Sequence, residues 1–290
     1  MSKRNSLFQW NLDRLVVPPL AVAALICVAI LLLVLAFLVY EASPVLVDGG
    51  WRVFLSDTGW YPLEGLFGLI PMLWASLVLM LGAVIIAAPI GLACAIFIKF
   101  YAPASLNKVF RLILSLLAGM PSVVLGLWGL TELVPLIAKW QPPGASLFAA
   151  ILVLALMVLP TVALTSASAL SAVREDLLAG AAALGIGRKA QVLGLVLPAA
   201  RYGIWSGILL AMARAIGETM VVLMVAGNVV QYPHGLFEPV RALTANIALE
   251  MAYATDNHRA GLFASGLMLT LIVLVLAWAA SRIVGRNQHG

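Results

Sequence analysis

The sequence predicts an all-α membrane protein with six transmembrane helices. Of its 290 residues, 63% are hydrophobic and only 10% are charged, and the mean hydropathy is +1.09. Soluble domains carry about 25% charged residues and about half apolar ones, so this composition excludes an ordinary soluble domain. A helix needs about 20 apolar residues to cross a bilayer, and the chain has room for six such runs. The chain is therefore expected to be a multi-pass protein of the cell (inner or plasma) membrane.

Apolar runs place the six helices between polar connections. The helices are expected near residues 18–40, 72–98, 112–137, 147–171, 201–228 and 260–284. The longest connections are 41–71, 172–200 and 229–259, and none is long enough for a soluble domain. We divide the chain into residues 1–69, with an N-terminal segment, the first helix and an outer loop, and a five-helix core at 70–290.

The basic residues predict the orientation. With the N-terminus inside, twelve of the seventeen Lys and Arg residues fall in inner segments or at their edges, and four fall outside. Cytoplasmic segments carry an excess of Lys and Arg, so both termini are expected to be cytoplasmic. The net charge of +5 then reflects orientation rather than a nucleic-acid partner. The inner twelve are Lys3, Arg4, Arg14, Lys99, Lys108, Arg111, Arg174, Arg188, Lys189, Arg201, Arg282 and Arg286; the outer four are Arg52, Lys139, Arg241 and Arg259.

The predicted helix 201–228 contains two full charges, Arg214 and Glu218, in its apolar interior. A charge at the middle of a membrane costs at least a few kcal/mol unless it faces protein or water. An arginine fork suits an oxyanion, and the carboxylate would neutralise it when the site is empty. A pair that only holds helices together is the alternative, although base before acid is the weaker order at this spacing. At 100° per residue, one face of this helix holds Gly203, Gly207, Ala211, Arg214, Glu218, Val221, Val225 and Asn228.

A second predicted helix, 112–137, contains Pro121 among several glycines. Pro121 has no backbone N–H and is expected to kink the helix. The N–H groups freed near Ser122, together with its hydroxyl, would suit an anion, and an ordinary proline kink is the alternative. Thr219 and Asn228 are further candidates for hydrogen bonds to an ion in the same pathway.

The cytoplasmic stretch 174–198 reads REDLLAGAAALGIGRKAQVLGLVLP. A helix-forming run ends at a pair of glycines, and a second short helix is expected to end before Pro198. Such a small α-turn-α unit suits docking into the groove of a partner. The order Gly185, nine residues, Leu195, one residue, Leu197-Pro198 resembles the EAA loop of ABC-importer permeases, although Ala179 and Gly180 stand where that family has Glu and Ala.

The EAA resemblance implies a coupling helix at about 178–187, within the loop 172–200, that inserts into an ATPase subunit. The coupling residues it implies are Ala183, Leu184, Gly185, Arg188, Leu197 and Pro198. The chain has no Gly-x4-Gly-Lys-Ser/Thr phosphate loop, so ATP and Mg are expected on partner ATPase chains. No cofactor, metal site or catalytic residue is expected in this chain itself.

Three stretches, 88–103, 116–130 and 197–228, are similar to the permeases of phosphate-specific (Pst) importers, and the Gly-Glu-Thr-Met run resembles one of the two subunit types. This resemblance implies the MetI-like type I permease architecture and phosphate passage along Arg214 and Glu218. It also implies a second, similar permease subunit, a cytoplasmic ATPase dimer and an extracytoplasmic phosphate-binding protein that docks on 41–71 and 229–259. The chain would then form half of the translocation pathway.

Other readings remain open. The same architecture could carry another oxyanion or a different small solute, and the arginine favours an anion. A secondary anion transporter could also use buried Arg and Glu, but it would usually have ten or more spans. The motifs of intramembrane or metal-dependent hydrolases are absent from the sequence, and its histidines lie outside the predicted spans. Cys27 and Cys94 fall inside predicted helices, which indicates apolar core residues rather than a disulfide.

Overall fold

The computed structural model describes the backbone of residues 3–56 and 59–285, and the side chains of residues 17–47, 50–56 and 59–282. Within the described residues, five helical segments are long and apolar enough to cross a membrane. A sixth span is made of two helices bent by 93° to each other, if this pair counts as one. The predicted helical membrane architecture is therefore confirmed.

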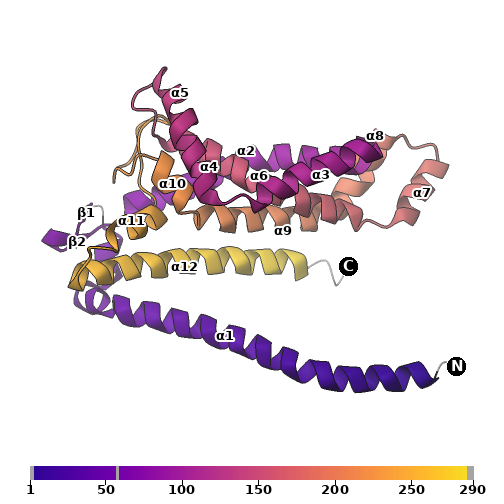
Figure 1. Ribbon diagram of the computed structural model, residues 1–290, viewed down its shortest axis with the longest axis horizontal. Helices are drawn as coiled ribbons and strands as arrows, with labels where there is room; N and C mark the ends of the chain where they lie inside the picture. Colours follow the sequence, from indigo (N-terminus) through magenta and orange to yellow (C-terminus); the bar gives the residue numbers. More distant parts are fainter. Residues whose placement is uncertain (1–2, 57–58, 286–290) are drawn as a thin grey trace.

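Helix α1 (Lys3–Phe54) packs along helix α12 (Asp256–Gly285) (Figure 1). It is much longer than the predicted span 18–40, and Gly50 interrupts it with a φ of 61°. Every side chain from Val17 to Val34 is exposed on this chain. α1 begins and α12 ends at the end of the molecule where α7 (Glu175–Ala183) lies (Figure 1). We call this end the α7 end.

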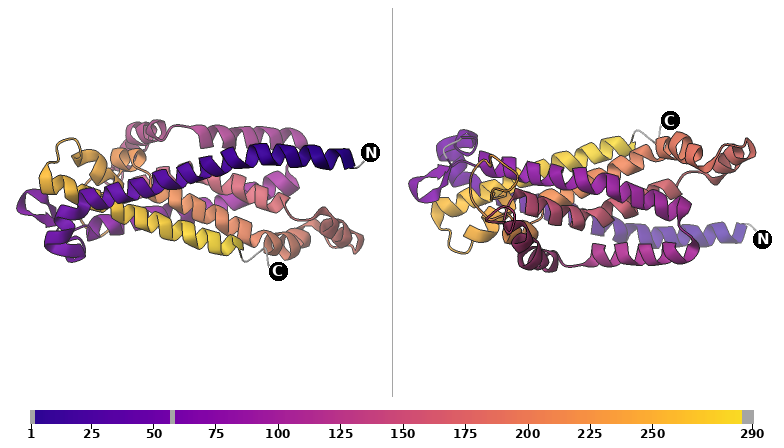
Figure 2. Two further views of the ribbon diagram at one scale, coloured as in Figure 1. Left: turned by 90° about the horizontal axis from the view of Figure 1, so that it is seen from below. Right: turned by 90° about the horizontal axis from the view of Figure 1, so that it is seen from above.

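The core is a bundle of α2 (Ile70–Ile96), α6 (Leu147–Ser171) and α9 (Leu197–Ile216), with α3 (Ala104–Gly119) and α12 on opposite sides of it (Figure 2). Small residues let these helices approach closely. A Cβ added to Gly91 of α2 would lie 2.9 Å from Val162 Cβ, and one on Gly207 of α9 would lie 2.2 Å from Thr165 Oγ1. This is the usual way in which helices pack in membranes.

The third predicted span, 112–137, is not one helix. α3 (Ala104–Gly119) ends before Pro121, and α4 (Ser122–Trp128) starts after it at the 93° bend. Proline cannot donate to the helical ladder and forces the preceding residue into extended backbone, and Met120 indeed has a ψ of 130°. The expected kink is confirmed, but it is a right-angled break, and α3 begins at Ala104, earlier than predicted.

Three π-helical turns are each followed two residues later by a proline. The ring of a proline inside a helix clashes with the carbonyl four residues earlier, and a wider turn relieves this clash at Pro135 and Pro198, whereas Pro103 follows extended Ala102 outside the helices. The prediction that a short helix ends before Pro198 is wrong for this reason, since Arg188–Ile216 forms one helical run. The turns are η2 (Phe97–Tyr101), before α3; η3 (Gly129–Leu133), before α5 (Val134–Ala138); and η4 (Val192–Val196), between α8 (Arg188–Gln191) and α9.

The opposite end, which we call the α11 end, holds α11 (Leu243–Glu250), α10 (Met220–Val225), α5 and a pair of short strands (Figure 1). The strands β1 (Trp60–Tyr61) and β2 (Leu66–Phe67) pair antiparallel around the 3-10 turn η1 (Pro62–Glu64). A separate apolar cluster here joins the first loop to α11 and α12. The all-helical prediction missed this strand pair, because two residues per strand are too few to produce a periodic pattern.

A methyl group at position 91 is expected to force α2 away from α6. Gly91→Ala would place Cβ 2.9 Å from Val162 Cβ and 3.1 Å from the Ala163 backbone nitrogen. Overpacking of this kind costs about 1–3 kcal/mol, so the purified protein should melt at a lower temperature in detergent. Gly194→Ala is the matched control, because no atom lies within 4 Å of a Cβ there. An unchanged melting temperature for Gly91→Ala would contradict this close approach.

Candidate functional site

The predicted helix 201–228 is broken just after Arg214. α9 ends at Ile216, and α10 follows after Gly217-Glu218-Thr219. Thr244 Oγ1 donates a 2.8 Å hydrogen bond to the Glu218 carbonyl, which would otherwise be left without a partner at a helix end. The prediction of one continuous face is therefore wrong. Arg214 lies in the last turn of α9, not in the middle of a helix.

Arg214 and Glu218 do not form an ion pair. The Arg214 side chain is exposed, and no hydrogen bond or ion pair holds its guanidinium within the described part of the chain. The Glu218 residue is half-buried, and its Oε1 accepts one long hydrogen bond, 3.5 Å from the Val221 nitrogen. The two charges thus lie on either side of a helix break without neutralising each other. The guanidinium also lies near the C-terminal end of α9, where a positive charge is favoured.

Asn228 and Thr219 lie at the two ends of α10. Asn228 has a φ of 57°, and its Nδ2 closes the helix with a 2.7 Å bond to the Leu223 carbonyl. Its Oδ1 is buried without a hydrogen-bond partner among the described residues. The Thr219 hydroxyl makes only a 3.4 Å contact with the Gly217 carbonyl. The predicted common helical face of Arg214 and Asn228 is therefore wrong, because the break separates the two residues.

The second broken helix lies against the first. A Cβ on Gly126 of α4 would lie 3.3 Å from Val221 Cα, and one on Gly129 would lie 2.9 Å from Val225 Cγ1. Since later residues of α4 face later residues of α10, the two short helices run in the same direction. Half-buried Ser122, the first residue of α4, thus lies at the same end of the pair as the Gly217-Glu218-Thr219 break. The structure therefore brings together two segments that the sequence could only indicate separately.

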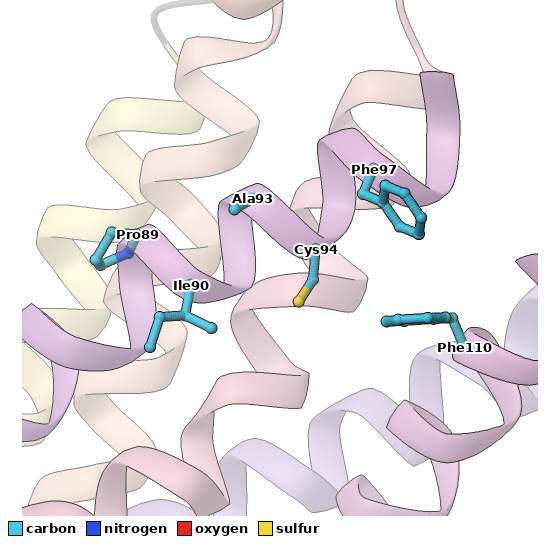
Figure 3. Close-up of a pocket in the computed structure, with 6 residues that line it drawn as sticks. All are labelled: Pro89, Ile90, Ala93, Cys94, Phe97 and Phe110. Atoms are coloured by element: carbon cyan, nitrogen blue, oxygen red, sulfur yellow. The ribbon is translucent and has the colours of Figure 1, made fainter. Parts of the chain in front are cut away.

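An apolar pocket of about 580 Å³ opens between α2 and α3 (Figure 3). Figure 3 shows the Phe110 ring of α3 opposite Cys94 and Phe97. The lining is hydrocarbon apart from the Cys94 thiol, so it offers no charge or strong hydrogen-bond donor to an oxyanion. The pocket is lined by Pro89, Ile90, Ala93, Cys94, Phe97 and Phe110.

The predicted coupling loop is a helix followed by a glycine turn. α7 spans Glu175–Ala183, so it starts and ends earlier than the predicted 178–187. Gly185 has a φ of 74°, its nitrogen donates to the Ala182 carbonyl at 3.0 Å, and the Ile186 nitrogen donates to the Ala181 carbonyl at 3.0 Å. These two bonds form a Schellman motif, which satisfies the last carbonyls of α7. A left-handed residue is needed here, and glycine adopts that conformation without steric cost.

α7 projects from the α7 end with most of its surface exposed (Figure 1). Only Ala181 is buried, whereas Leu184 is 81% exposed and Ala183 is exposed too. The Arg188 Nη1 donates a 2.9 Å bond to the Phe100 carbonyl, which ties the turn after α7 to η2. Of the remaining predicted coupling residues, Leu197 is half-buried and Pro198 is exposed, both in the first turn of α9.

One exposed ion pair lies at the start of α7. The Arg174 guanidinium pairs with the Asp176 carboxylate and holds the pKa of that carboxyl below its ordinary value. The pair is exposed to solvent, so it contributes little to stability.

A buried polar cluster at the α11 end was missed from the sequence. Glu250 Oε1 accepts from Arg241 Nη1 at 2.7 Å, and its Oε2 accepts from Trp60 Nε1 at 2.6 Å and lies 2.9 Å from His258 Nε2. Arg241 also donates to Asn246 Oδ1 at 3.1 Å. The sequence shows Arg241 only as an outer charge and His258 as a loop histidine. Contacts such as Trp60–Glu250, which join residues 190 positions apart, leave no local pattern to find.

Residues 87–288 match the family described as binding-protein-dependent transport system inner membrane component. The chain belongs to this family. It is thus a permease-type transport component and a multi-pass protein of the cell membrane, as the sequence predicted. The match begins at residue 87, and the division of the chain at residue 70 stays a prediction.

Curated relatives of this inner membrane component cover most of its length. It is 36% identical over 259 residues to the probable ABC transporter permease protein YqgH of Bacillus subtilis (85% of this chain, 81% of that protein). It is 32% identical over 263 residues to the phosphate transport system permease protein PstC of Haemophilus influenzae (80% of this chain, 84% of that protein). The resemblance to Pst permeases seen in the Gly-Glu-Thr-Met run is therefore confirmed.

Solved structures share the fold of this inner membrane component at lower identity. A bacterial alginate ABC transporter covers 99% of this chain and 98% of its own, with a TM-score of 0.64 and 14% identity. The MetNI methionine ABC transporter matches 78% of this chain and 98% of its own, with a TM-score of 0.62 and 20% identity. These likenesses confirm the MetI-like permease fold.

Removing the Arg188 side chain is expected to loosen the turn after α7. Arg188→Ala deletes the bond to the Phe100 carbonyl, a loss of about 1 kcal/mol of local stability. Hydrogen exchange followed by mass spectrometry should show faster exchange over residues 184–190. Lys189→Ala is the control, since that exposed side chain makes no hydrogen bond within the described residues. Equal exchange in the two variants would show that the bond does not hold the turn.

Proposed function

We propose that this chain is a permease subunit of an ATP-driven importer of inorganic phosphate and forms half of the translocation pathway. The observation that carries this proposal is the unpaired Arg214 at the α9–α10 break, with Glu218 one turn beyond it. Relatives named phosphate transport system permease protein PstC support phosphate as the ion. We assign ATP hydrolysis to separate chains and assign no catalytic residue, cofactor or metal to this one.

The proposed selectivity depends on the opposite charges of Arg214 and Glu218. At neutral pH phosphate is a mixture of mono- and dianion, and an arginine fork offsets much of the cost of removing an oxyanion from water. The Glu218 carboxylate repels a bare dianion but accepts a hydrogen bond from a protonated phosphate oxygen. Sulfate carries no proton at this pH, so the pair favours phosphate. Ser122 and Thr219 supply neutral hydrogen-bonding groups near the break, and Asn228 supplies one at the far end of α10.

The proposed partners follow from the two ends of the molecule. We assign exposed α7, with its glycine turn, as the helix that a cytoplasmic ATPase dimer engages, and both termini are then expected in the cytoplasm as well. The loops 41–71 and 229–259 would then face outward and receive a phosphate-binding protein. A second, similar permease subunit completes the pathway. Transport of phosphate by this chain alone would contradict this assembly.

Another oxyanion or small solute in the same architecture is the main alternative. The relative YqgH is named only as a probable ABC transporter permease, without a substrate. Arg214 favours an anion over a neutral solute, and the comparison of phosphate with sulfate distinguishes between oxyanions. A secondary anion transporter is less consistent with the family to which the chain belongs.

Arg214→Gln is expected to lower phosphate uptake about tenfold to a hundredfold, because a charge-assisted bond to the ion is lost. Glu218→Gln should lower the preference for phosphate over sulfate, because the repulsion of a dianion is removed. Uptake of labelled phosphate and sulfate by the assembled complex in vesicles measures both, with ATP hydrolysis followed in parallel.

Arg201→Gln is the matched control for Arg214→Gln. Arg201 lies on the same helix, and its guanidinium contacts only the neighbouring Tyr202 within the described residues. Phosphate uptake by the Arg201→Gln variant should stay near the wild-type rate. If Arg214→Gln and Glu218→Gln both transport phosphate at the wild-type rate, the two charges are structural and the proposed pathway is wrong.

Substitutions at Gly185 are expected to distinguish the effect of its backbone conformation from the effect of side-chain bulk. Gly185 has open space around it but a φ of 74°, so Ala there costs about 1 kcal/mol or more, whereas Asn tolerates this conformation better. Gly185→Ala should therefore lower phosphate uptake per ATP hydrolysed more than Gly185→Asn does. Gly185→Trp adds bulk at the same position and should uncouple transport while membrane insertion is kept. Normal coupling in Gly185→Trp would argue against α7 as the coupling helix.

A further inference from the structure

α10 cannot hold its own position. It has six residues, and isolated helices shorter than about 12–15 residues are marginal even with favourable sequences. It lies between the break at Gly217-Glu218-Thr219 and the turn at Asn228. Glu218 and Asn228, two candidate pathway residues, therefore depend on the packing of α10 against α4 and on contacts at its two ends.

Side chains at the start of α11 hold both ends. Thr244 is buried, and its Oγ1 donates to the Glu218 carbonyl at 2.8 Å. Arg241, just before α11, donates from Nε to the Asn228 carbonyl at 2.9 Å. Two neighbouring side chains thus bond the backbone on both sides of α10.

The start of α11 is fixed on the bundle. The backbone nitrogen of Leu243, its first residue, donates to Ser76 Oγ of α2 at 3.0 Å. The Ser76 hydroxyl in turn donates to the Met72 carbonyl at 2.8 Å, within α2 itself. The position of Thr244 therefore follows that of a core helix.

The far end of α11 is fixed by Glu250. This buried carboxylate holds the Arg241 guanidinium on one oxygen, and Trp60 of β1 and His258 of α12 on the other. Arg241 is thereby prevented from rotating away from the Asn228 carbonyl. A guanidinium held by three acceptors has little freedom left, because its donors are fixed in one plane.

We propose that Arg241, Thr244 and Glu250 form a clamp, the α11 clamp, that positions residues 217–228 for passage of the ion. The three are positioning residues: they hold the backbone on both sides of α10 and need not touch the ion. The inference rests on the proposed function, because it takes residues 217–228 as part of the pathway. Trp60 and His258 tie the same clamp to the first loop and to α12.

The test is a matched pair of substitutions at Thr244 in the assembled transporter. Thr244→Val keeps the shape and removes the hydroxyl, whereas Thr244→Ser keeps the hydroxyl. In Thr244→Val, the backbone amides of residues 217–222 should exchange about fivefold to tenfold faster than in wild type, because one hydrogen bond is lost. Amide exchange in α2 and α6 should be unchanged. Its maximum rate of phosphate uptake should fall by a similar factor without a change in KM for the loaded binding protein. Thr244→Ser should remain within about twofold of wild type on both measures.

Arg241→Lys provides an independent test at the C-terminal end of α10. A lysine nitrogen cannot bond Asn228, Asn246 and Glu250 in the planar arrangement of a guanidinium. Faster exchange is expected over residues 225–229 rather than 217–222, again with a lower maximum rate.

Amide exchange at the wild-type rate in both Thr244→Val and Arg241→Lys would contradict the α11 clamp. Faster amide exchange combined with wild-type phosphate uptake would contradict it as well. The Arg214→Gln variant, measured alongside, keeps the two proposals apart. Phosphate uptake at the wild-type rate in Arg214→Gln would contradict the proposed pathway. The amide exchange data would still decide whether α11 holds α10.

Discussion

A polar backbone group that is buried needs a hydrogen-bond partner in place of water, and this constraint governs the break between α9 and α10. Ending α9 at Ile216 leaves carbonyls that a continuous helix would have bonded. The structure supplies replacements at both places: the Thr244 hydroxyl bonds the Glu218 carbonyl after α9, and the Asn228 amide bonds the Leu223 carbonyl at the end of α10. A broken helix is stable here because other elements complete its hydrogen bonding.

The same constraint explains the buried cluster around Glu250. A buried carboxylate is costly unless its partners are well placed, and removing one partner of a buried pair typically costs more than the pair contributes. Glu250 receives bonds from the first loop, from the segment before α11 and from α12. Apolar residues would stabilise these contacts more simply. What the charged cluster adds is direction, because each hydrogen bond sets the angle as well as the distance at which two segments meet.

Features with a local cause could be predicted from the sequence, and those with a distant cause could not. Pro121 breaks its own helix, and Gly185 ends α7 through its own left-handed backbone, so both were visible in the residues themselves. The break at Gly217 was missed because its stabilising bond comes from Thr244, in a later helix. The continuation through Pro198 was missed because a π turn accommodates the ring. For the site, the residue types Arg214 and Glu218 were found, but their separation by a helix break depends on tertiary contacts.

The glycine turn after α7 has a consequence for any chain that docks there. Its backbone hydrogen bonds lie between residues 180 and 186, so the end of α7 is closed by its own backbone. Exposed Leu184 is held next to that turn instead of being ordered on contact. Binding would then require little loss of conformational entropy from this side of the interface. A force applied to α7 would also be transmitted as a rigid-body displacement, because the connection to the long helix beginning at Arg188 has few torsions left to absorb it.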